Sequence, residues 1–253
     1  MKKLYLSVIL LAILCLTSCV DIEEHFTFKA DGSCNVSYGF DMGRAVAVLM
    51  NLMPDSVRDS PQFNVAKDTS MNFYAALPDS TQRKLTSDEV KMAQSSNLAV
   101  KMNLKRSVMK VSISHQAKNA SDLQYYLEHI SQISMGSNQL NNVAKSKAAS
   151  GFNTQLTAGG DYYNYEVSAH KFYRVVDKNK FNAFLKKTGS VFATAKAMLI
   201  DMPYKVVLNF AKPVKKVNNP KAIISPDKKQ VTLQADMADV IKDPTIMNLK
   251  VDF

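Results

Sequence analysis

The sequence predicts an α+β domain: an antiparallel β-sheet built from hairpins, with helices packed on one face. Three observations lead to this fold class. Residues 22–40 and 97–115 alternate apolar and polar side chains on either side of short turns, as β-hairpins do. Residues 41–53 and 123–133 instead repeat apolar side chains at helical spacing. With 253 residues, 46% hydrophobic and 21% charged, the chain has a globular composition and can bury a core.

The first hairpin has a well-specified register. A three-residue loop ending at Gly32 gives glycine the positive φ that a type I turn plus bulge requires. Phe28 then lies opposite Cys34, and one face of the hairpin becomes almost wholly apolar. Glu24 is the exception on that face. A carboxyl in an apolar site would be a candidate general acid, but we expect Glu24 at the open end of the hairpin, near solvent.

The remaining elements follow from the same two periodicities and from turn residues. They are expected as helices over 41–53 and 87–94, a hairpin over 97–115 turning at 105–108, a helix capped at Asn119 or Ser121, a strand over 162–176, a helix over 177–187 that Gly189 ends, strands over 204–210, 221–225, 230–235 and 246–253, and a helical segment over 236–242. Residues 136–161 are small and polar and predict a mobile loop within one domain over 19–253.

The N-terminus is a processing signal rather than part of the fold. Lys2 and Lys3 precede an apolar run over 4–16, which at thirteen residues is too short to span a bilayer. The following Leu16-Thr17-Ser18-Cys19 resembles the lipobox of bacterial lipoproteins. The resemblance implies that Cys19 receives a diacylglyceryl group and that residues 1–18 are removed. The alternative is an ordinary secreted protein with a chance cysteine at its cleavage site.

The residues after the lipobox bear on location. Val20 stands where an Asp would hold an enterobacterial lipoprotein in the inner membrane, so the analogy favours the outer membrane. The acidic run over 21–24 resembles the export tags of Bacteroidetes surface lipoproteins. The expected location is therefore the outer membrane, on its periplasmic face or at the cell surface. Here the lipid on Cys19 would join the domain to the bilayer, since two or three acyl chains anchor stably.

Positive charge is concentrated in one stretch of the chain. The formal charge is 32 − 22 = +10, and residues 171–229 alone carry 14 basic and 3 acidic side chains, or +11. Such a stretch could meet anionic lipid, glycolipid or an envelope protein. The candidate contacts are Lys212, Lys215, Lys216 and Lys221. The alternative is a solvated surface, and nucleic acid is not an expected partner because export separates the protein from it.

No motif for a reaction is present in the sequence. His25, His115, His129 and His170 have no partner at metal-ligand spacing, so we expect neither a metal site nor a cofactor. Cys34 would need a base to act as a nucleophile, but the hairpin register places His25 on the opposite face. The acidic pair Asp236 and Asp239 lies one helical turn apart, as solvated helix faces often do. We therefore expect a protein that is not an enzyme.

Both ends of the chain resemble one group of lipoproteins. Phe26 to Ser33, with its Asp-Gly-Ser turn, and the strands over 204–210 and 227–232 are similar to the LppM-like lipoprotein domain. The resemblance covers about a third of the chain and brings no catalytic residues. It implies an envelope protein, with lipid or glycolipid binding in some members. We expect a lipid-anchored protein that acts as a binding or structural module. The alternative is a lipid- or glycolipid-binding domain with an apolar cavity. A third possibility is a hydrolase-type enzyme.

Overall fold

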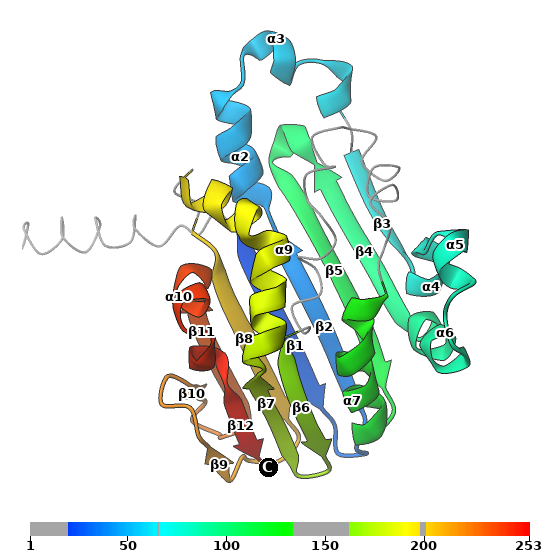
Figure 1. Cartoon of the computed structure of the whole chain (residues 1–253), viewed down its shortest axis with the longest axis vertical. Helices are drawn as coiled ribbons and strands as arrows, with labels where there is room; N and C mark the ends of the chain where they lie inside the picture. Colours follow the sequence, from blue (N-terminus) through cyan, green and yellow to red (C-terminus); the bar gives the residue numbers. More distant parts are fainter. Residues whose placement is uncertain (1–19, 65, 134–161, 198–200) are drawn as a thin grey trace, which may run out of the picture.

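The computed structural model describes residues 20–64, 66–133, 162–197 and 201–253. The signal segment with Cys19, and the polar segment over 136–161, lie outside the described residues. The described residues form two β-sheets (Figure 1). The smaller sheet and helices α7 and α9 lie on the same face of the larger sheet. The expectation of an α+β fold with mostly antiparallel strands and helices on one face is confirmed.

The larger sheet has eight strands in the order β10-β11-β8-β1-β2-β5-β4-β3. Its strands are β1 (Asp21–Phe28), β2 (Cys34–Asp41), β3 (Ala66–Asn72), β4 (Ser96–Asn103), β5 (Val108–Ala117), β8 (Pro203–Phe210), β10 (Ile223–Ile224) and β11 (Gln230–Asp236). Neighbouring strands are antiparallel except β1 and β8, which are parallel. One face is apolar and packed, and the other carries polar side chains such as Thr27, Asn35 and Gln116, as a half-solvated antiparallel sheet does.

The smaller sheet was not expected. It has the order β6-β7-β12-β9, formed by β6 (Tyr163–Ser168), β7 (Lys171–Val176), β12 (Leu249–Asp252) and β9 (Lys216–Val217). The prediction of one strand over 162–176 is wrong, because the chain turns at Ala169 and His170 and pairs back on itself. That turn contains neither Gly nor Pro, so the usual signal of a hairpin is missing.

Helices occupy one end, one edge and the covered face of the large sheet (Figure 1). They are α2 (Gly43–Leu52), α3 (Asp55–Arg58), α4 (Phe73–Ala76), α5 (Asp79–Gln82), α6 (Ser87–Gln94), α7 (Ala120–His129), α9 (Lys178–Ala197) and α10 (Met237–Lys242), with 3₁₀ turns η1 (Pro61–Phe63), η2 (Leu104–Arg106), η3 (Ile130–Gln132) and η6 (Pro244–Met247). Asn119 caps α7 as expected, and Thr86 forms a capping box with Glu89 on α6.

The first hairpin has the predicted register. Phe28 pairs with Cys34, Phe26 with Val36, and His25 with Ser37. The loop is closed by the amide of Lys29, which donates to the carbonyl of Ser33 at 2.9 Å, and Gly32 has φ +83°. The turn residues and the alternation of apolar side chains were sufficient to predict this register, because the two strands are adjacent in the sequence.

The prediction that Gly189 ends a helix is wrong. Helix α9 continues through Gly189 to Ala197. Phe181 and Phe192, on either side of Gly189, are both buried in the core. Their packing offsets the helix propensity that glycine lacks, which is about 1 kcal/mol relative to alanine.

Two glycines therefore give opposite expectations when replaced by alanine. A Cβ at Gly189 would contact nothing within 4 Å, so Gly189→Ala is expected to raise the free energy of unfolding by about 0.5–1 kcal/mol. A Cβ at Gly43 would lie 2.6 Å from the Ser107 carbonyl oxygen, so Gly43→Ala is expected to cost about 1–3 kcal/mol. Urea unfolding followed by far-UV circular dichroism measures both. Equal effects of the two substitutions would contradict the placement of α2 against η2.

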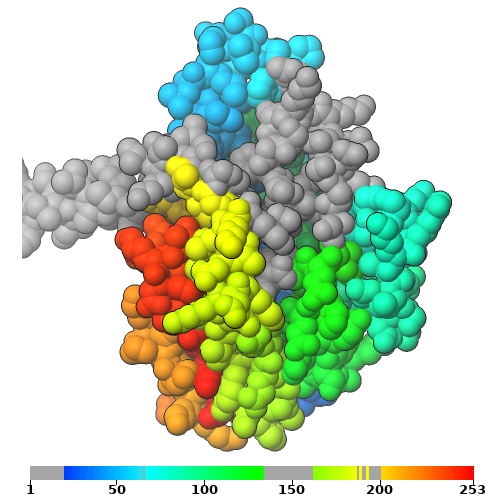
Figure 2. Space-filling model, in the orientation of Figure 1, coloured from blue at the N-terminus to red at the C-terminus, as the bar shows by residue number. Residues whose placement is uncertain are grey.

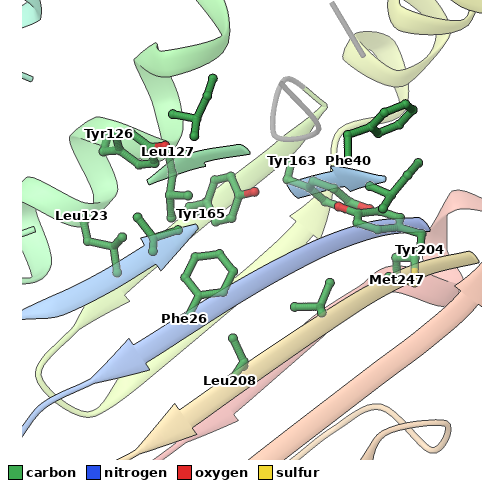
Figure 3. Packing of buried hydrophobic residues seen from close by; sticks show 14 of the residues in the cluster. Phe26, Phe40, Leu123, Tyr126, Leu127, Tyr163, Tyr165, Tyr204, Leu208 and Met247 are labelled. Carbon is green, nitrogen blue, oxygen red and sulfur yellow. The ribbon is translucent and has the colours of Figure 1, made fainter. Parts of the chain in front are cut away.

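The core lies between the large sheet and the layer formed by the small sheet and helices. Phe172 of β7 is fully buried, and its ring lies 4.9 Å from that of Phe26 and 5.7 Å from that of Phe28. Figure 3 shows Tyr163 and Tyr165 of the small sheet close to Phe26 and Tyr204 of the large one. The two sheets therefore share one hydrophobic core.

Candidate functional site

A pocket opens at the end of the domain where β1, β2 and β8 meet their turns. Its volume is about 260 Å³. The residues around it come from the β1–β2 loop, the start of α7, the β6–β7 turn and the C-terminus: Phe28, Lys29, Gly32, Ser33, Cys34, Asn119, Ala120, Ser121, Leu123, Val167, Ser168, Ala169 and Phe253. The volume is somewhat below the range of ligand pockets for drug-sized molecules. It suits the end of an acyl chain or another small apolar group.

Cys34 lines this pocket but is not activated. Its side chain is buried, and that burial raises the pKa of the thiol to about 12. Its sulfur lies on the inner face of the hairpin, whereas His25 lies on the outer face and pairs with Glu23 at 3.0 Å. The predicted placement of Cys34 and His25 on opposite faces of the hairpin is confirmed, and a thiol of this pKa is protonated at neutral pH.

The basic stretch over 171–229 does not form a single face. Arg174 points into the core, Lys205 pairs with Glu23 on the outer face of the large sheet at 3.4 Å, and α9 lies over the opposite face. The candidate contacts Lys212, Lys215, Lys216 and Lys221 are all exposed.

Two of these candidates lie close to residues that line the pocket. Lys215 Nζ donates to the carbonyl of Phe253 at 3.2 Å. Lys212 follows Ala211, whose amide donates to the carbonyl of Phe28 at 3.1 Å. Lys212 and Lys215 are therefore basic residues of this stretch that could meet a charged group outside the pocket.

A buried ion pair joins the two sheets at the centre of the domain. Arg174 of β7 is 0% exposed and Glu24 of β1 is 3% exposed. Arg174 Nη1 donates to Glu24 Oε2 at 2.6 Å, and Nη2 donates to the Tyr204 hydroxyl at 2.5 Å. The Tyr204 hydroxyl in turn donates to Glu24 Oε1. Burial by itself would lower the pKa of Arg174, but the Glu24 carboxylate, together with the surrounding tyrosines, more than reverses this and keeps the guanidinium charged.

Tyrosine rings surround this pair. The guanidinium carbon of Arg174 lies 3.7 Å from the centre of the Tyr163 ring and 5.2 Å from that of Tyr204. Burial raises the pKa values of Tyr162, Tyr163 and Tyr204, so their hydroxyls remain protonated. The cluster is enclosed and fully desolvated, which is the environment of a structural ion pair.

The expectation that Glu24 lies near solvent is wrong. Its neighbours along β1 gave no indication of a partner, because Arg174 is 150 residues away in the sequence. The sequence did contain one indication of a buried partner for Glu24, which is a single arginine on the apolar face of an alternating strand. In Lys171 to Val176, Phe172, Arg174 and Val176 share one face, and both neighbours of Arg174 on that face are buried. A charge on such a face requires a buried counter-charge, and Glu24 is the corresponding exception in β1.

Ser96 and His115 form a second buried polar contact. His115 Nδ1 lies 3.0 Å from Ser96 Oγ, and the imidazole stacks on Tyr126 with ring centres 4.2 Å apart. The Ser96 hydroxyl donates to the carbonyl of Met92 at 2.7 Å, so it is the acceptor in its contact with His115. Both side chains are buried. The pair resembles a nucleophile and base in distance alone, since the serine proton is directed away from the histidine.

His115 gives the protein an expected pH dependence. Burial lowers its pKa below the ordinary value of about 6.5. The unfolded chain therefore binds this proton more readily, and the free energy of unfolding should fall as pH decreases below about 6.5, by at most ~1.4 kcal/mol per pH unit. Urea unfolding between about pH 7.5 and pH 5 measures this slope. His115→Gln should reduce this dependence of the free energy of unfolding on pH. His170→Gln is the control, because His170 is exposed. An equal reduction in both variants would contradict the assignment to His115.

The other candidate groups have structural partners. Asp236 caps α10 by accepting a hydrogen bond from the amide of Ala238 at 2.7 Å, and Asp239 pairs with Lys242 at 3.3 Å. Within the four described segments, no three His, Cys, Asp or Glu side chains are grouped so that they could hold a metal ion. None of the helices in those segments has the length and apolar character needed to cross a membrane.

The residue after the lipobox cysteine is already part of the folded domain. Val20 is 5% exposed, and its amide donates to the carbonyl of Asp201 at 3.1 Å. Asp21 already pairs with Asp41 in the sheet. Cys19 itself lies outside the described residues, but it is bonded to Val20, and consecutive α-carbons are ~3.8 Å apart. A lipid on Cys19 would therefore hold the domain without an intervening linker.

The fold and these sites define an α+β domain with two sheets on one core, a structural ion pair and a small apolar pocket. No protein-family model and no curated protein matches the chain. The structure is similar to the folded domain of the LppM protein of Mycobacterium tuberculosis, determined by NMR, over 93% of this chain and 89% of that one. The TM-score is 0.34 and the sequence identity 7%. A likeness at this level establishes neither a common fold nor a common function.

Proposed function

We propose that this protein is a lipid-anchored lipoprotein of the cell envelope, held by acyl chains on Cys19 in the outer membrane, and that it acts as a non-enzymatic binding module. The packing of Val20 in the fold carries the proposal. A lipobox-like sequence ends an apolar run of signal-peptide length, and the residue directly after its cysteine is buried in the domain. This arrangement is the one expected of a domain processed at Cys19.

The pocket favours a lipid or glycolipid as the ligand. Its inner surface carries Phe28, Leu123, Val167 and Phe253, which suit an acyl chain end, and Lys29 stands at its edge. Lys212 and Lys215 lie nearby and would meet an anionic headgroup. The pocket lies at the turn end of β1, and Val20 lies at the opposite end of that strand. The anchor would thus leave the pocket facing away from the membrane surface.

Intact mass spectrometry of the protein, extracted without denaturing washes, tests both statements. The mature chain is expected to have the mass of residues 19–253 plus two or three acyl chains, with a further non-covalent lipid. Ala169→Trp, in the pocket, should abolish that lipid adduct, whereas His170→Trp, the next residue and outside the lining, should retain it. An unlipidated chain that starts near Cys19 would refute the anchor. A lipidated chain without a non-covalently bound lipid would refute lipid binding by the pocket but leave the anchor intact.

A further inference from the structure

Helix α2 has apolar side chains on both of its sides. Its inner side, with Val46 and Met50, packs on Phe63, Met102 and Leu104. Its outer side exposes Val48 by 37% and Leu52 by 70%, and Val57 of α3 is 39% exposed. Arg44 is the single charged residue among the ten of α2. Asn51 is exposed as well, so the outer side is mixed, and a cluster of exposed apolar side chains on it indicates a contact with protein or lipid.

This helix begins beside the position of the proposed anchor. Asp21 of β1 pairs with Asp41 of β2, and α2 starts two residues later at Gly43. From there α2 and α3 project past the end of the large sheet, as the blue and light-blue elements at the top of Figures 1 and 2 show. Ten helical residues extend about 15 Å. The exposed apolar side chains are therefore on the end of the domain from which the chain leads to Cys19.

We propose that Val48, Leu52 and Val57 lie in the boundary between headgroups and acyl chains of the bilayer that carries the lipid on Cys19. The inference rests on the proposed anchor, because the anchor supplies the bilayer next to α2. With no linker at Val20, the domain cannot move far from the membrane surface. Interfacial helices bury their apolar side about 5–10 Å deep.

Charges around this segment suit that depth. Lys105 and Arg106 are exposed in η2, which packs against α2. Long basic side chains place their charged ends among headgroups while their stems lie along apolar groups. Arg58 of α3 forms an ion pair with Asp55, so this pair brings no net charge to the contact, and exposed Asp59 adds one negative charge against the two positive charges of η2.

Quenching by brominated lipid tests the contact. Leu52→Cys and Ile223→Cys would each be labelled with bimane in the full, lipidated protein and reconstituted into phosphatidylethanolamine–phosphatidylglycerol vesicles with acyl-brominated lipid. Cys34 should escape labelling at neutral pH, because its pKa is about 12. Ile223 of β10 is a control that is 72% exposed and does not line the pocket. Fluorescence at position 52 is expected to fall to about half, and that at position 223 to stay unchanged.

The outcomes separate this contact from the anchor. Protein that floats with the vesicles but shows equal fluorescence at both positions would refute the contact and leave the anchor intact. Protein that does not float would refute the anchor and the contact with it. Disulfides between Leu52→Cys chains, with no lipid quenching, would mean that a second copy covers α2 and would also refute the proposal. Val48→Lys/Leu52→Lys should abolish quenching of a label at Val57→Cys.

Discussion

Arg174→Met is expected to lower the free energy of unfolding by about 3–5 kcal/mol, because it leaves the Glu24 carboxylate buried without its counter-charge. Glu24→Leu should cost a similar amount by leaving the guanidinium unpaired. The double variant Glu24→Leu/Arg174→Met removes both charges and should recover most of the loss, since apolar replacements of a buried pair are often neutral or stabilising. Urea unfolding by far-UV circular dichroism is suitable because the chain has no Trp.

An exposed ion pair provides the control for this cycle. Lys205→Met breaks the contact of β8 with Glu23 on the outer face of β1 and should cost less than about 1 kcal/mol. If Arg174→Met costs no more than Lys205→Met, the buried pair is not what joins the two sheets. If the double variant is no more stable than either single one, the loss comes from packing around Tyr163 and Tyr204 rather than from an unpaired charge.

Phe172→Ala should cost about 3–5 kcal/mol, as large-to-small substitutions of fully buried aromatic residues do. Its ring lies against Phe26, Phe28 and Tyr165, so the cavity would open between the two sheets. Ile223→Ala is the matched surface control, because Ile223 is 72% exposed and such changes stay within about 0.5 kcal/mol. Urea unfolding measures both variants.

Hydrogen exchange on the Phe172→Ala protein extends this test to the whole domain. Both sheets share one core, so amides in β1 and β7 should lose protection together. Exchange of β7 amides well before β1 amides would show that the small sheet opens by itself. That result would contradict the expectation of one domain over the mature chain.

Features set by neighbouring residues were predictable from the sequence. The register of the first hairpin, the cap at Asn119 and the start of α6 depend on residues within a few positions of one another. The helix over 41–53 was also predictable, because its apolar spacing is local. Its outer side chains could not be recognised as exposed, since that depends on where the sheet ends.

Features set by distant residues were not predictable. The second sheet pairs β7 with β12, which are more than seventy residues apart, and the Glu24–Arg174 contact joins residues from different sheets. The prediction that the helix ends at Gly189 was wrong because the packing of Phe192 outweighs the low helix propensity of glycine. The pocket could not be anticipated either, since four separate loops and ends build it. Cys19 lies outside the described residues, and its lipidation stays a prediction.

The central place of β1 has a consequence for when the chain can fold. Ile22 pairs with Tyr204, a separation of 204 − 22 = 182 residues, and β8 in turn pairs with β11. In a chain exported as proposed above, the strand nearest the lipobox would lack one of its two neighbours until most of the polypeptide had crossed the inner membrane. Long-range pairing of this kind slows folding. The processing enzymes would therefore meet an extended segment around Cys19, and the domain would close only after translocation is nearly complete.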